Sequence, residues 1–470
     1  MPDTERYEAL IIGSGEAGKL MAWTLAKAGH HTAVIERKLV GGSCPNIACL
    51  PSKNIIRSAK VASFAHRAQE FGLEIGSPTT NMAGVQRRKQ KMVADLIQVH
   101  LDRYKASGAE LIMGTARFTA PRTVEVSLNA GGSKTIAGER VFLNVGTRAT
   151  IPDVPGLAAS QPMTHVEVLD LDRLPEHLIV IGGGFVALEL SQAMRRFGSR
   201  VTVIEKNHQL LSKEDSDVGA ALLDLFRDEG IEVLRDTEVL KVEGRSGQQV
   251  RVHVRDAKGE RVIEGSDLLV ATGRTANTRG LDLDQAGVEL DARGYIKVNH
   301  RLETTAPNVW AMGDCAGSPH FTHVAFDDFR IVRDNLNGGN RTTEGRLIPF
   351  CIFTDPELAR VGLNESEANT RGIAYRVANM PMAAILRTRT LSEPRGFVKM
   401  LIDAHSDRIL GFTVFGVEAS ELLAAVQTAM LGDLPYTALR DAIFTHPTMA
   451  EGLTVLLASV VAAKETLQAA

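Results

Sequence analysis

The chain is poor in cysteine, and this scarcity excludes one class of protein. Only 4 of its 470 residues are cysteines, too few for the disulfide framework that stabilises small secreted domains. Two of the four, Cys44 and Cys49, are close neighbours in the sequence. A pair this close can form a small disulfide ring without long-range contacts, and strained or exposed bridges of this kind are the labile, catalytic ones. The pair therefore indicates reactive thiols rather than a structural cross-link.

An excess of one charge and long apolar runs are also lacking. The net charge is −3 and the pI about 6.5, so composition gives no case for binding nucleic acid or a membrane surface. The longest late apolar run, residues 453–463, is far shorter than the roughly 20 residues that cross a bilayer. The polar start, residues 2–6, leads directly into an apolar stretch, so we expect no signal peptide and a cytoplasmic protein.

Metal ligands are scarce around the cysteine pair. No second pair of cysteines or histidines lies at ligand spacing from Cys44 and Cys49, so a tetrahedral zinc site would lack ligands. We therefore predict no metal ion and a redox role for the pair, with two unlinked buried cysteines as the alternative.

What is present begins with a nucleotide-binding pattern near the start. The chain is long enough for three or more domains. An apolar strand over residues 7–12 leads into a G-x-G-x-x-G loop, then a helix, then a second strand that ends in an acid. Such glycines let the backbone approach a pyrophosphate at a helix N-terminus, and the acid binds ribose hydroxyls. The residues that mark this fingerprint are Gly13, Gly15, Gly18 and Glu36.

A second copy of the pattern begins at residue 178. It again runs strand, glycine loop, helix, strand and acid, and its marking residues are Gly182, Gly184, Ala187 and Glu205. Duplication is more specific than either copy alone, and together with the cysteines it indicates a flavin, a nicotinamide and a disulfide in series. Glu205 would repel a 2′-phosphate, whereas alanine at the third position is often found with NADPH. We give the charge argument more weight and predict NADH, with NADPH less favoured.

Other glycines and acids follow strands in the same manner. Gly146 precedes a proline-rich hinge at residues 151–156, and Gly273 follows an apolar strand. Gly313 and Asp314 follow another strand, where the carboxylate could reach a ribitol hydroxyl of the first dinucleotide.

Two further stretches complete the pass along the chain. The helical stretch at residues 54–104 carries Arg87, Arg88, Lys89 and Lys91, which we interpret as a solvated helix face. After about residue 345 an α+β pattern without a fingerprint begins. Near its end His446 stands before a proline and Glu451 follows, which makes an acid–base pair a candidate and a structural hydrogen bond the alternative.

At this point the chain resembles the pyridine nucleotide–disulfide oxidoreductases over essentially its whole length. Their pattern G-G-T-C-x-N-x-G-C-x-P-S-K occurs here at residues 41–53, with Ser43 in place of threonine and Ala48 in place of glycine. The resemblance implies an α/β fold with two Rossmann-like dinucleotide-binding domains and a C-terminal α+β dimerisation domain. It also implies a homodimer with FAD, and this order of domains: FAD-binding, 1–150; NAD(P)-binding, 151–270; central, 271–345; dimerisation, 346–470.

The resemblance also implies roles for single residues. Cys44 would attack the substrate, and Cys49 would lie against the flavin as the charge-transfer thiolate. Gly42 and Ser43, which directly precede Cys44, would contact FAD. Lys53 and Glu189 would form an ion pair near the flavin. Phe185 would cover the nicotinamide pocket, and His446 with Glu451 would be an acid–base pair that serves the partner subunit.

The sequence defines the substrate less well than the redox centre. We expect a disulfide of low molecular weight or on a protein. A C-terminal cysteine pair of the mercuric reductase type is absent, Phe444 replaces the first histidine of the dihydrolipoamide dehydrogenase motif, and no arginine pattern indicates glutathione. The alternatives are reduction of Hg(II), Cu(II) or a quinone, a dihydrolipoamide dehydrogenase-like subunit of a larger complex, or a redox-sensing flavoprotein.

Overall fold

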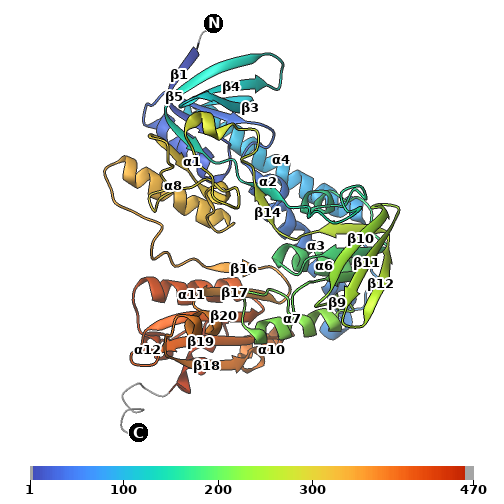
Figure 1. Ribbon diagram of the computed structural model, residues 1–470. Helices are drawn as coiled ribbons and strands as arrows, with labels where there is room; N and C mark the ends of the chain where they lie inside the picture. Colours follow the sequence, from blue (N-terminus) through green and yellow to red (C-terminus); the bar gives the residue numbers. More distant parts are fainter. Residues whose placement is uncertain (1–3, 461–470) are drawn as a thin grey trace.

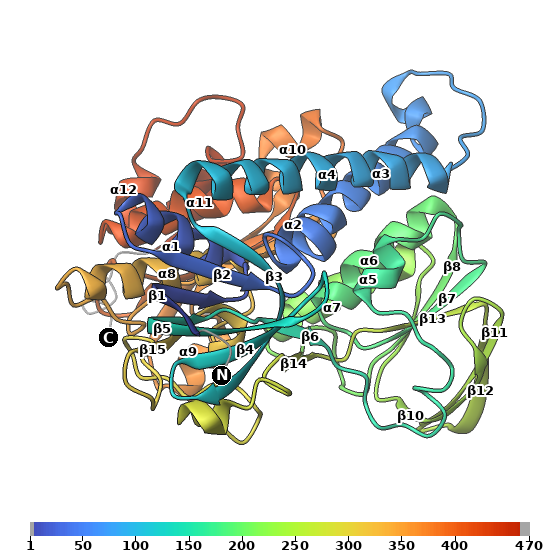
Figure 2. The same ribbon diagram turned by 90° about the horizontal axis from the view of Figure 1, so that it is seen from above.

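The computed structural model describes residues 4–460, which form three regions around separate sheets (Figures 1 and 2). The first region, at the top of Figure 1, contains both the N-terminal strand and later parts of the chain. The second region lies to the right, and the C-terminal region lies below. No described helix is long and apolar enough to cross a membrane.

The first region is a parallel sheet extended by an antiparallel strand. Leu10, Ile11 and Phe142 are fully buried in its centre, as expected where both faces of a parallel sheet are covered. β4 (Thr123–Leu128) joins the long outer parts of β3 and β5 in antiparallel fashion. The parallel strands, in spatial order, are β3 (Glu110–Ala120), β2 (Thr32–Glu36), β1 (Thr4–Ile12), β5 (Ser133–Leu143) and β15 (Val309–Ala311).

Helices of the first region cover one face of its sheet and carry the cysteines. Trp23 and Phe329 pack from two of these helices onto the sheet face that contains Phe142. The helices that pack on this face are α1 (Glu16–Lys27), α4 (Met82–Ser107) and α8 (Thr322–Leu336). The cysteines lie on α2 (Ser43–Ile47) and α3 (Cys49–His66), and α3 packs against α4 and against helix α6 (Phe185–Phe197) of the second region.

The second region repeats the plan on a smaller scale. Its parallel sheet is covered by helices on one face and by an antiparallel sheet on the other, where Ile179 packs against Val252. The parallel strands are β13 (Asp267–Val270), β7 (His177–Ile181), β8 (Arg200–Ile204) and β9 (Glu232–Leu234). The helices are α5 (His165–Leu169), α6 (Phe185–Phe197) and α7 (Ser216–Asp228), and the antiparallel strands are β10 (Glu238–Arg245), β11 (Gln249–Asp256) and β12 (Gly259–Gly265). Strands β6 (Thr147–Ala149) and β14 (Arg274–Ala276) pair where the chain passes between the two regions.

The C-terminal region is an antiparallel sheet with helices packed on it. Its strands, in spatial order, are β16 (Phe350–Ile352), β17 (Glu357–Gly362), β20 (Ile409–Gly416), β19 (Phe397–Asp403) and β18 (Tyr375–Pro381). Its helices are α9 (Glu365–Thr370), α10 (Leu386–Thr390), α11 (Ala419–Leu431), α12 (Tyr436–Arg440) and α13 (Gly452–Ala458). The predicted fold class, with parallel sheets followed by a C-terminal antiparallel one, is confirmed.

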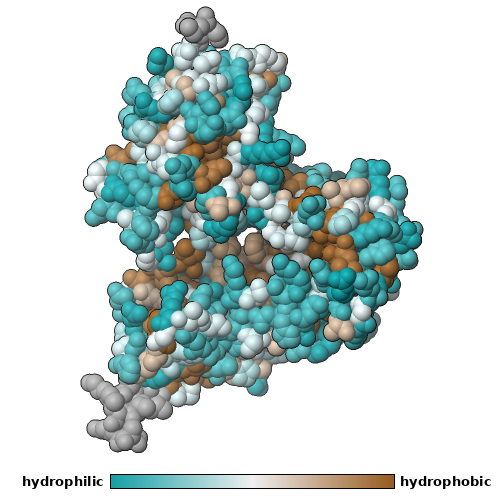
Figure 3. Space-filling model, viewed as in Figure 1, coloured by the Kyte–Doolittle hydropathy of each residue, from teal (hydrophilic) through white to brown (hydrophobic). Residues whose placement is uncertain are grey.

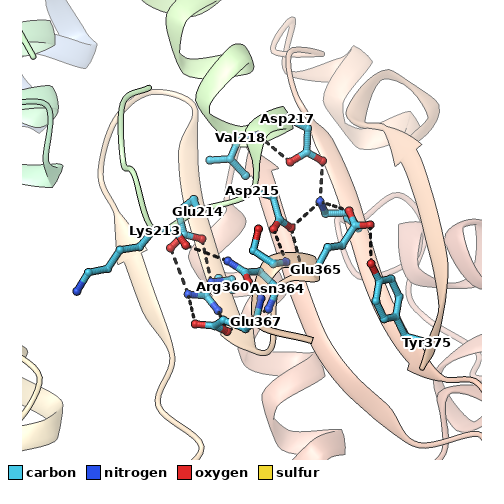
Figure 4. Close-up of polar contacts among 12 residues, drawn as sticks. Lys213, Glu214, Asp215, Asp217, Val218, Arg360, Asn364, Glu365, Glu367 and Tyr375 are labelled. Carbon is cyan, nitrogen blue, oxygen red and sulfur yellow. Dashed lines mark hydrogen bonds and ion pairs between the residues drawn. The ribbon is translucent and has the colours of Figure 1, made fainter. Parts of the chain in front are cut away.

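A buried ionic cluster fixes the second region to the C-terminal sheet (Figure 4). Lys399 on β19 is 1% exposed, and its Nζ contacts the carboxylates of Asp215 (2.9 Å), Asp217 (2.7 Å) and Glu365 (2.8 Å). Beside it Arg360 on β17 pairs with Glu214 and Glu367. Because Asp215 is the residue before α7, the cluster holds the start of that helix against the C-terminal sheet.

The helix face predicted to be solvated is only partly so. Arg87, Arg88 and Lys91 are exposed, but Lys89 is 4% exposed, and its Nζ lies 2.5 Å from Asp170 at the end of α5. The interpretation of Lys89 as solvated was therefore wrong. The reason is tertiary: α4 lies against the α5 segment, and a buried ammonium needs a charged partner.

The visible face of the molecule is hydrophilic over most of its area (Figure 3). Apolar residues gather around the hollow between the upper and lower parts of this view and over the right-hand part.

Candidate active site

The stretch at residues 41–53 places both thiols beside the first glycine loop. Gly41 and Gly42 adopt left-handed backbone conformations, with φ of 90° and 76°, which other residues rarely adopt. A Cβ on Gly42 would lie 2.6 Å from the Cα of Gly15, so only glycine permits this close approach. Cys44 then lies in α2, and Cys49 is the first residue of α3.

The two thiols are free in this structure, and their environments favour different protonation states. A hydrogen bond from the Cys44 thiol, another from the Thr322 hydroxyl and the charge of Lys53 outweigh burial and lower the pKa of Cys49 to about 6. The hydrogen bond that the Cys44 thiol donates to Cys49, together with burial, raises the pKa of Cys44. Cys49 is therefore the thiolate of the pair at neutral pH, and Cys44 is the thiol.

Thr322 approaches Cys49 from a distant part of the chain. Its Oγ1 lies 3.2 Å from the Cys49 sulfur, and it is the first residue of α8. Helix N-termini favour negative charge, and Cys49 also begins a helix of its own. The sulfur thus lies at the start of two helices, where a thiolate is favoured.

An ion pair one turn beyond Cys49 joins all three regions. Lys53 Nζ lies 2.8 Å from Glu189 Oε2, and the Glu189 side chain is 4% exposed. The backbone N–H of Phe353, next to β16, donates to Glu189 Oε1 at 2.8 Å. The predicted pairing of Lys53 with Glu189 is present, and it connects α3, α6 and the C-terminal region.

The first glycine loop is bonded to three other segments. The Glu36 carboxylate accepts from the N–H and hydroxyl of Ser14 at 3.0 and 2.7 Å, and from the N–H groups of Lys38 and Leu39. Asn144 accepts from the Gly18 N–H at 3.0 Å and donates to the Met312 carbonyl at 2.7 Å. The loop, the strand end at Glu36, the segment after β5 and the segment after β15 therefore form one unit.

The second loop has fewer side-chain hydrogen bonds to other segments, although the Leu211 N–H donates to the Gly183 carbonyl at 3.1 Å. The Glu205 carboxylate accepts from the N–H and the side-chain amide of Asn207, at 2.7 and 2.5 Å. A Cβ on Gly183 would lie 2.6 Å from Glu205 Oε2, so the carboxylate lies directly beneath the glycine loop. This is where an acid that binds a ribose is expected.

One cavity brings most of the predicted residues together. Its lining includes the following of them: Gly13, Gly15, Glu36, Gly42, Ser43, Cys44, Cys49, Lys53, Gly146, Phe185, Glu189, Gly313 and Asp314. The remaining ones lie outside that lining: Gly18, Gly182, Gly184, Glu205, Gly273, His446 and Glu451. The cavity therefore extends from the first glycine loop past the thiols to the start of α6. Among the described residues, no group of histidine, cysteine and acid side chains could hold a metal ion.

His446 and Glu451 form a pair far from the thiols in the sequence. The Nδ1 of His446 lies 2.9 Å from both carboxylate oxygens of Glu451, and the His446 side chain is 61% exposed. No contact joins His446 to Cys44 or Cys49 within the described part of this chain. The pair is oriented as an acid–base pair requires, but its imidazole faces solvent.

Sequence reasoning missed several side chains that line the cavity. Thr322, His165, Asn144 and Arg274 all lie there. Arg274 donates to the Thr147 hydroxyl at 2.7 Å, and that hydroxyl donates to Asp314 at 2.6 Å. The positions of Thr322 and Asn144, each at the end of a regular element, were the only signals that the sequence offered.

Comparison with known proteins identifies the class of protein. Residues 7–328 match the family profile described as pyridine nucleotide-disulphide oxidoreductase, and residues 348–456 match the dimerisation domain of the same family. The chain belongs to this family and is a flavoprotein disulfide reductase.

Individual relatives cover nearly the whole chain. The "Probable pyridine nucleotide-disulfide oxidoreductase RclA" of Escherichia coli is 35% identical over 97% of this chain and 99% of its own length. A mercuric reductase of Acidithiobacillus ferrooxidans is 34% identical over 96% of this chain and 82% of its own. A solved structure of Escherichia coli RclA in a Cu(II) complex, described as an HOCl-induced flavoprotein disulfide reductase, is also similar. It has a TM-score of 0.89 at 34% identity and covers 97% of this chain and 100% of that one.

Membership implies FAD and a nicotinamide dinucleotide, and the residues present fit a flavin dinucleotide. The first loop is packed so closely against its neighbours that a Cβ on Gly13 would lie 2.3 Å from the Asn144 carbonyl oxygen. At Gly146, by contrast, a Cβ would meet nothing within 4 Å, so the backbone there is open to the cavity. This combination of a tightly packed loop and an accessible backbone suits a dinucleotide whose phosphates contact N–H groups.

Proposed function

We propose that this protein is an NADH-dependent reductase that passes electrons through FAD to the Cys44–Cys49 pair and from there to a disulfide substrate. The observation that carries the proposal is the position of Cys49. Its sulfur lies 3.2 Å from the Thr322 hydroxyl, in the same cavity as Cys44, Lys53 and the first glycine loop. FAD, when bound there, would supply the two-electron relay between nicotinamide and thiols.

The reduced pair can carry out disulfide exchange with balanced bonds and electrons. Cys44 loses its proton and attacks one substrate sulfur, which forms a mixed disulfide and releases one substrate thiolate. The Cys49 thiolate then attacks the Cys44 sulfur, breaks the mixed disulfide and releases the second substrate thiolate. The substrate gains two electrons, and the enzyme is left with a Cys44–Cys49 disulfide.

The proton on Cys44 needs a base, and we assign that role to His446 of the partner subunit. Glu451 orients its Nδ1, and within the described part of its own chain His446 has no contact with the thiols. Apolar side chains are exposed in the same region, with Ile443 at 102%, Leu431 at 67% and Val455 at 51%. A second copy of the chain would cover such residues, in keeping with the dimerisation domain.

Glu205 supports NADH as the electron donor. Its carboxylate lies beneath the second glycine loop, where it can accept from ribose hydroxyls and repels a 2′-phosphate. The acid therefore favours NADH over NADPH.

Cu(II) is a second candidate electron acceptor, and it would be a substrate rather than a resident ion. Two thiolates are soft ligands suited to copper, and the similar structure of RclA is a Cu(II) complex. In this reaction the dithiol would reduce two Cu(II) to two Cu(I), lose two protons and become the disulfide.

An acceptor panel tests the proposal. NADH oxidation would be followed with glutathione disulfide, lipoamide, coenzyme A disulfide, Hg(II), Cu(II) and a quinone, using wild type and Cys44→Ser. Turnover of one disulfide that is lost in Cys44→Ser is the expected result. Turnover of Cu(II) alone, lost in the variant, would favour the second candidate. Turnover only of quinone or metal, retained in the variant, would contradict a role for the thiols.

A further inference from the structure

The wall of the cavity that belongs to the second region is mostly apolar. It is formed by residues of α5 and α6, namely His165, Leu169, Phe185, Val186, Glu189 and Leu190. Only His165 and Glu189 are polar, and the Glu189 carboxylate already binds Lys53 and the Phe353 N–H. His165 is therefore the polar side chain of this wall that remains for a ligand.

The imidazole of His165 is buried without a partner. The residue is 8% exposed, and its Nε2 is inaccessible to solvent and has no hydrogen-bond partner among the described residues. Buried polar groups in native proteins are almost always paired. Because His165 also lines the cavity, its ring is a candidate to hydrogen-bond a group bound there. Burial and the nearby Arg274 lower the pKa of His165 to about 4, so the ring is neutral at physiological pH, with one N–H donor and one acceptor nitrogen.

The protein holds His165 in place from both ends of its short helix. Before it, Thr164 and Glu167 form a reciprocal capping box, in which Glu167 Oε2 accepts from the Thr164 N–H at 2.7 Å. After it, Asp170 binds the buried Lys89 and also Gln86, at 2.5 and 3.3 Å. This is the ion pair that explains why Lys89 is buried while its neighbours on α4 are exposed.

The surroundings of α5 point to the flavin. The helix packs against α2 and α3, which carry the cysteines, and against α6. Its histidine lines the same cavity as Gly13 of the first glycine loop, whereas the glycines of the second loop lie outside that lining.

We propose that the imidazole of His165 hydrogen-bonds bound FAD from the second region and so takes part in holding and tuning the flavin. The residue is a positioning residue for the cofactor that the family implies. The contact would make FAD a ligand of both regions, since the first loop and α5 belong to different ones.

The variants that test this are His165→Leu, His165→Gln and the control His177→Leu. His177 on β7 is another buried histidine of the second region, but its Nδ1 lies 2.7 Å from the Glu264 carbonyl oxygen and its Nε2 lies 2.9 Å from the Thr202 hydroxyl. It does not line the cavity. The control therefore removes a buried imidazole that is already paired.

Three quantities would be measured on each protein: the dissociation constant of FAD, the visible absorption spectrum of the flavin, and the KM for NADH. We expect about tenfold weaker FAD binding and a displaced flavin spectrum in His165→Leu, as loss of one good hydrogen bond implies. We also expect recovery to within about threefold in His165→Gln, whose amide can still donate and accept. In His177→Leu the affinity and the spectrum should match wild type, even if the protein unfolds more easily.

Three results would overturn the proposal. One is FAD affinity and spectrum unchanged in His165→Leu. Another is equal loss of FAD in His177→Leu, which would make the effect merely structural. The third is a changed KM for NADH with unchanged FAD parameters, which would assign the contact to nicotinamide. If His165→Leu does not fold, His165→Phe takes its place, because its ring has a shape similar to that of the imidazole but no hydrogen-bonding nitrogen. Wild-type FAD affinity and spectrum in His165→Phe would contradict the contact.

Discussion

The two glycine loops share a sequence pattern but differ in how firmly they are fixed. In the first, Gly18 leaves no room for a side chain, because a Cβ there would lie 2.2 Å from the Gly13 carbonyl oxygen. At the same position in the second loop, Ala187 is fully buried and is accommodated. Among the described residues, the Glu36 carboxylate accepts from donors of two segments, whereas the Glu205 carboxylate accepts from Asn207 alone.

The difference fits the roles proposed for the two loops. A loop tied to several segments suits a cofactor that stays bound through every turnover, because little further ordering is required on binding. A loop with few ties suits a dinucleotide that enters and leaves. The first loop is also the one that adjoins the thiols, so a cofactor held there would lie beside the reactive sulfurs.

The largest expected effect would come from removing the ionic cluster that holds the second region against the C-terminal sheet. Lys399→Met leaves Asp215, Asp217 and Glu365 without their common cation, and we expect unfolding free energy to fall by about 3 kcal/mol. Denaturant titration measures this. Lys297→Met is the control, because Lys297 pairs with Glu289 at the surface and should cost under about 1 kcal/mol. Equal losses in the two variants would contradict a special role for the cluster.

The next largest effect concerns the third fingerprint position, where the first loop has Gly18 and the second has Ala187. Gly18→Ala forces a Cβ against the Gly13 carbonyl, and we expect a cost of about 2 kcal/mol, which is roughly thirtyfold in FAD affinity. The reverse change, Ala187→Gly, should leave FAD binding intact and reduce stability by about 1 kcal/mol through helix propensity. FAD dissociation constants and thermal unfolding measure both. Similar FAD affinity in both variants would show that the loops are equally tolerant.

A smaller effect concerns coenzyme choice. Glu205→Ala removes the carboxylate beneath the second loop, and we expect the ratio of kcat/KM for NADH over NADPH to fall about tenfold, or 1.4 kcal/mol. Glu36→Ala is the matched change in the first loop and should weaken FAD binding without altering that ratio. A ratio unchanged in Glu205→Ala would contradict the assignment of NADH.

The smallest effect concerns the pKa of Cys49, in the thiol pair that lies beside the first loop. The pKa of Cys49 is lowered to about 6, so its thiolate should be present above that pH and lost below it. Thr322→Val removes one stabilising hydroxyl, and we expect the midpoint to rise by about half a pH unit, or 0.7 kcal/mol. Ultraviolet absorbance of the thiolate against pH, in reduced protein, measures this.

Ser52→Ala is the control for that titration. Its hydroxyl bonds the Cys49 carbonyl rather than the sulfur, so the midpoint should stay where it is in wild type. A shift of the same size in Ser52→Ala would mean that the helix start, and not the Thr322 contact, determines the pKa.

Much of the fold and part of the site were predictable because their causes are local. Each dinucleotide fingerprint spans a few dozen residues, and its strand, loop, helix and acid follow from short-range sequence pattern. The pairing of Lys53 with Glu189, by contrast, was implied by the family resemblance and not by local pattern.

What the sequence did not indicate depends on tertiary packing. Thr322 reaches Cys49 from 273 residues away in the chain, and His165 enters the cavity only because α5 packs against the cysteine helices. Lys89 was misread for the same reason, since its partner Asp170 lies on a different element. Local periodicity carries no signal for such contacts.

The central claim is that electrons from NADH reach the Cys44–Cys49 pair. The most direct test adds one equivalent of NADH, without oxygen, to FAD-loaded protein whose pair has been oxidised, followed by thiol alkylation and mass spectrometry. The account predicts two new alkylated thiols per NADH consumed, at Cys44 and Cys49, with Cys315 and Cys351 unchanged. Consumption of NADH without new thiols at those two positions would contradict it.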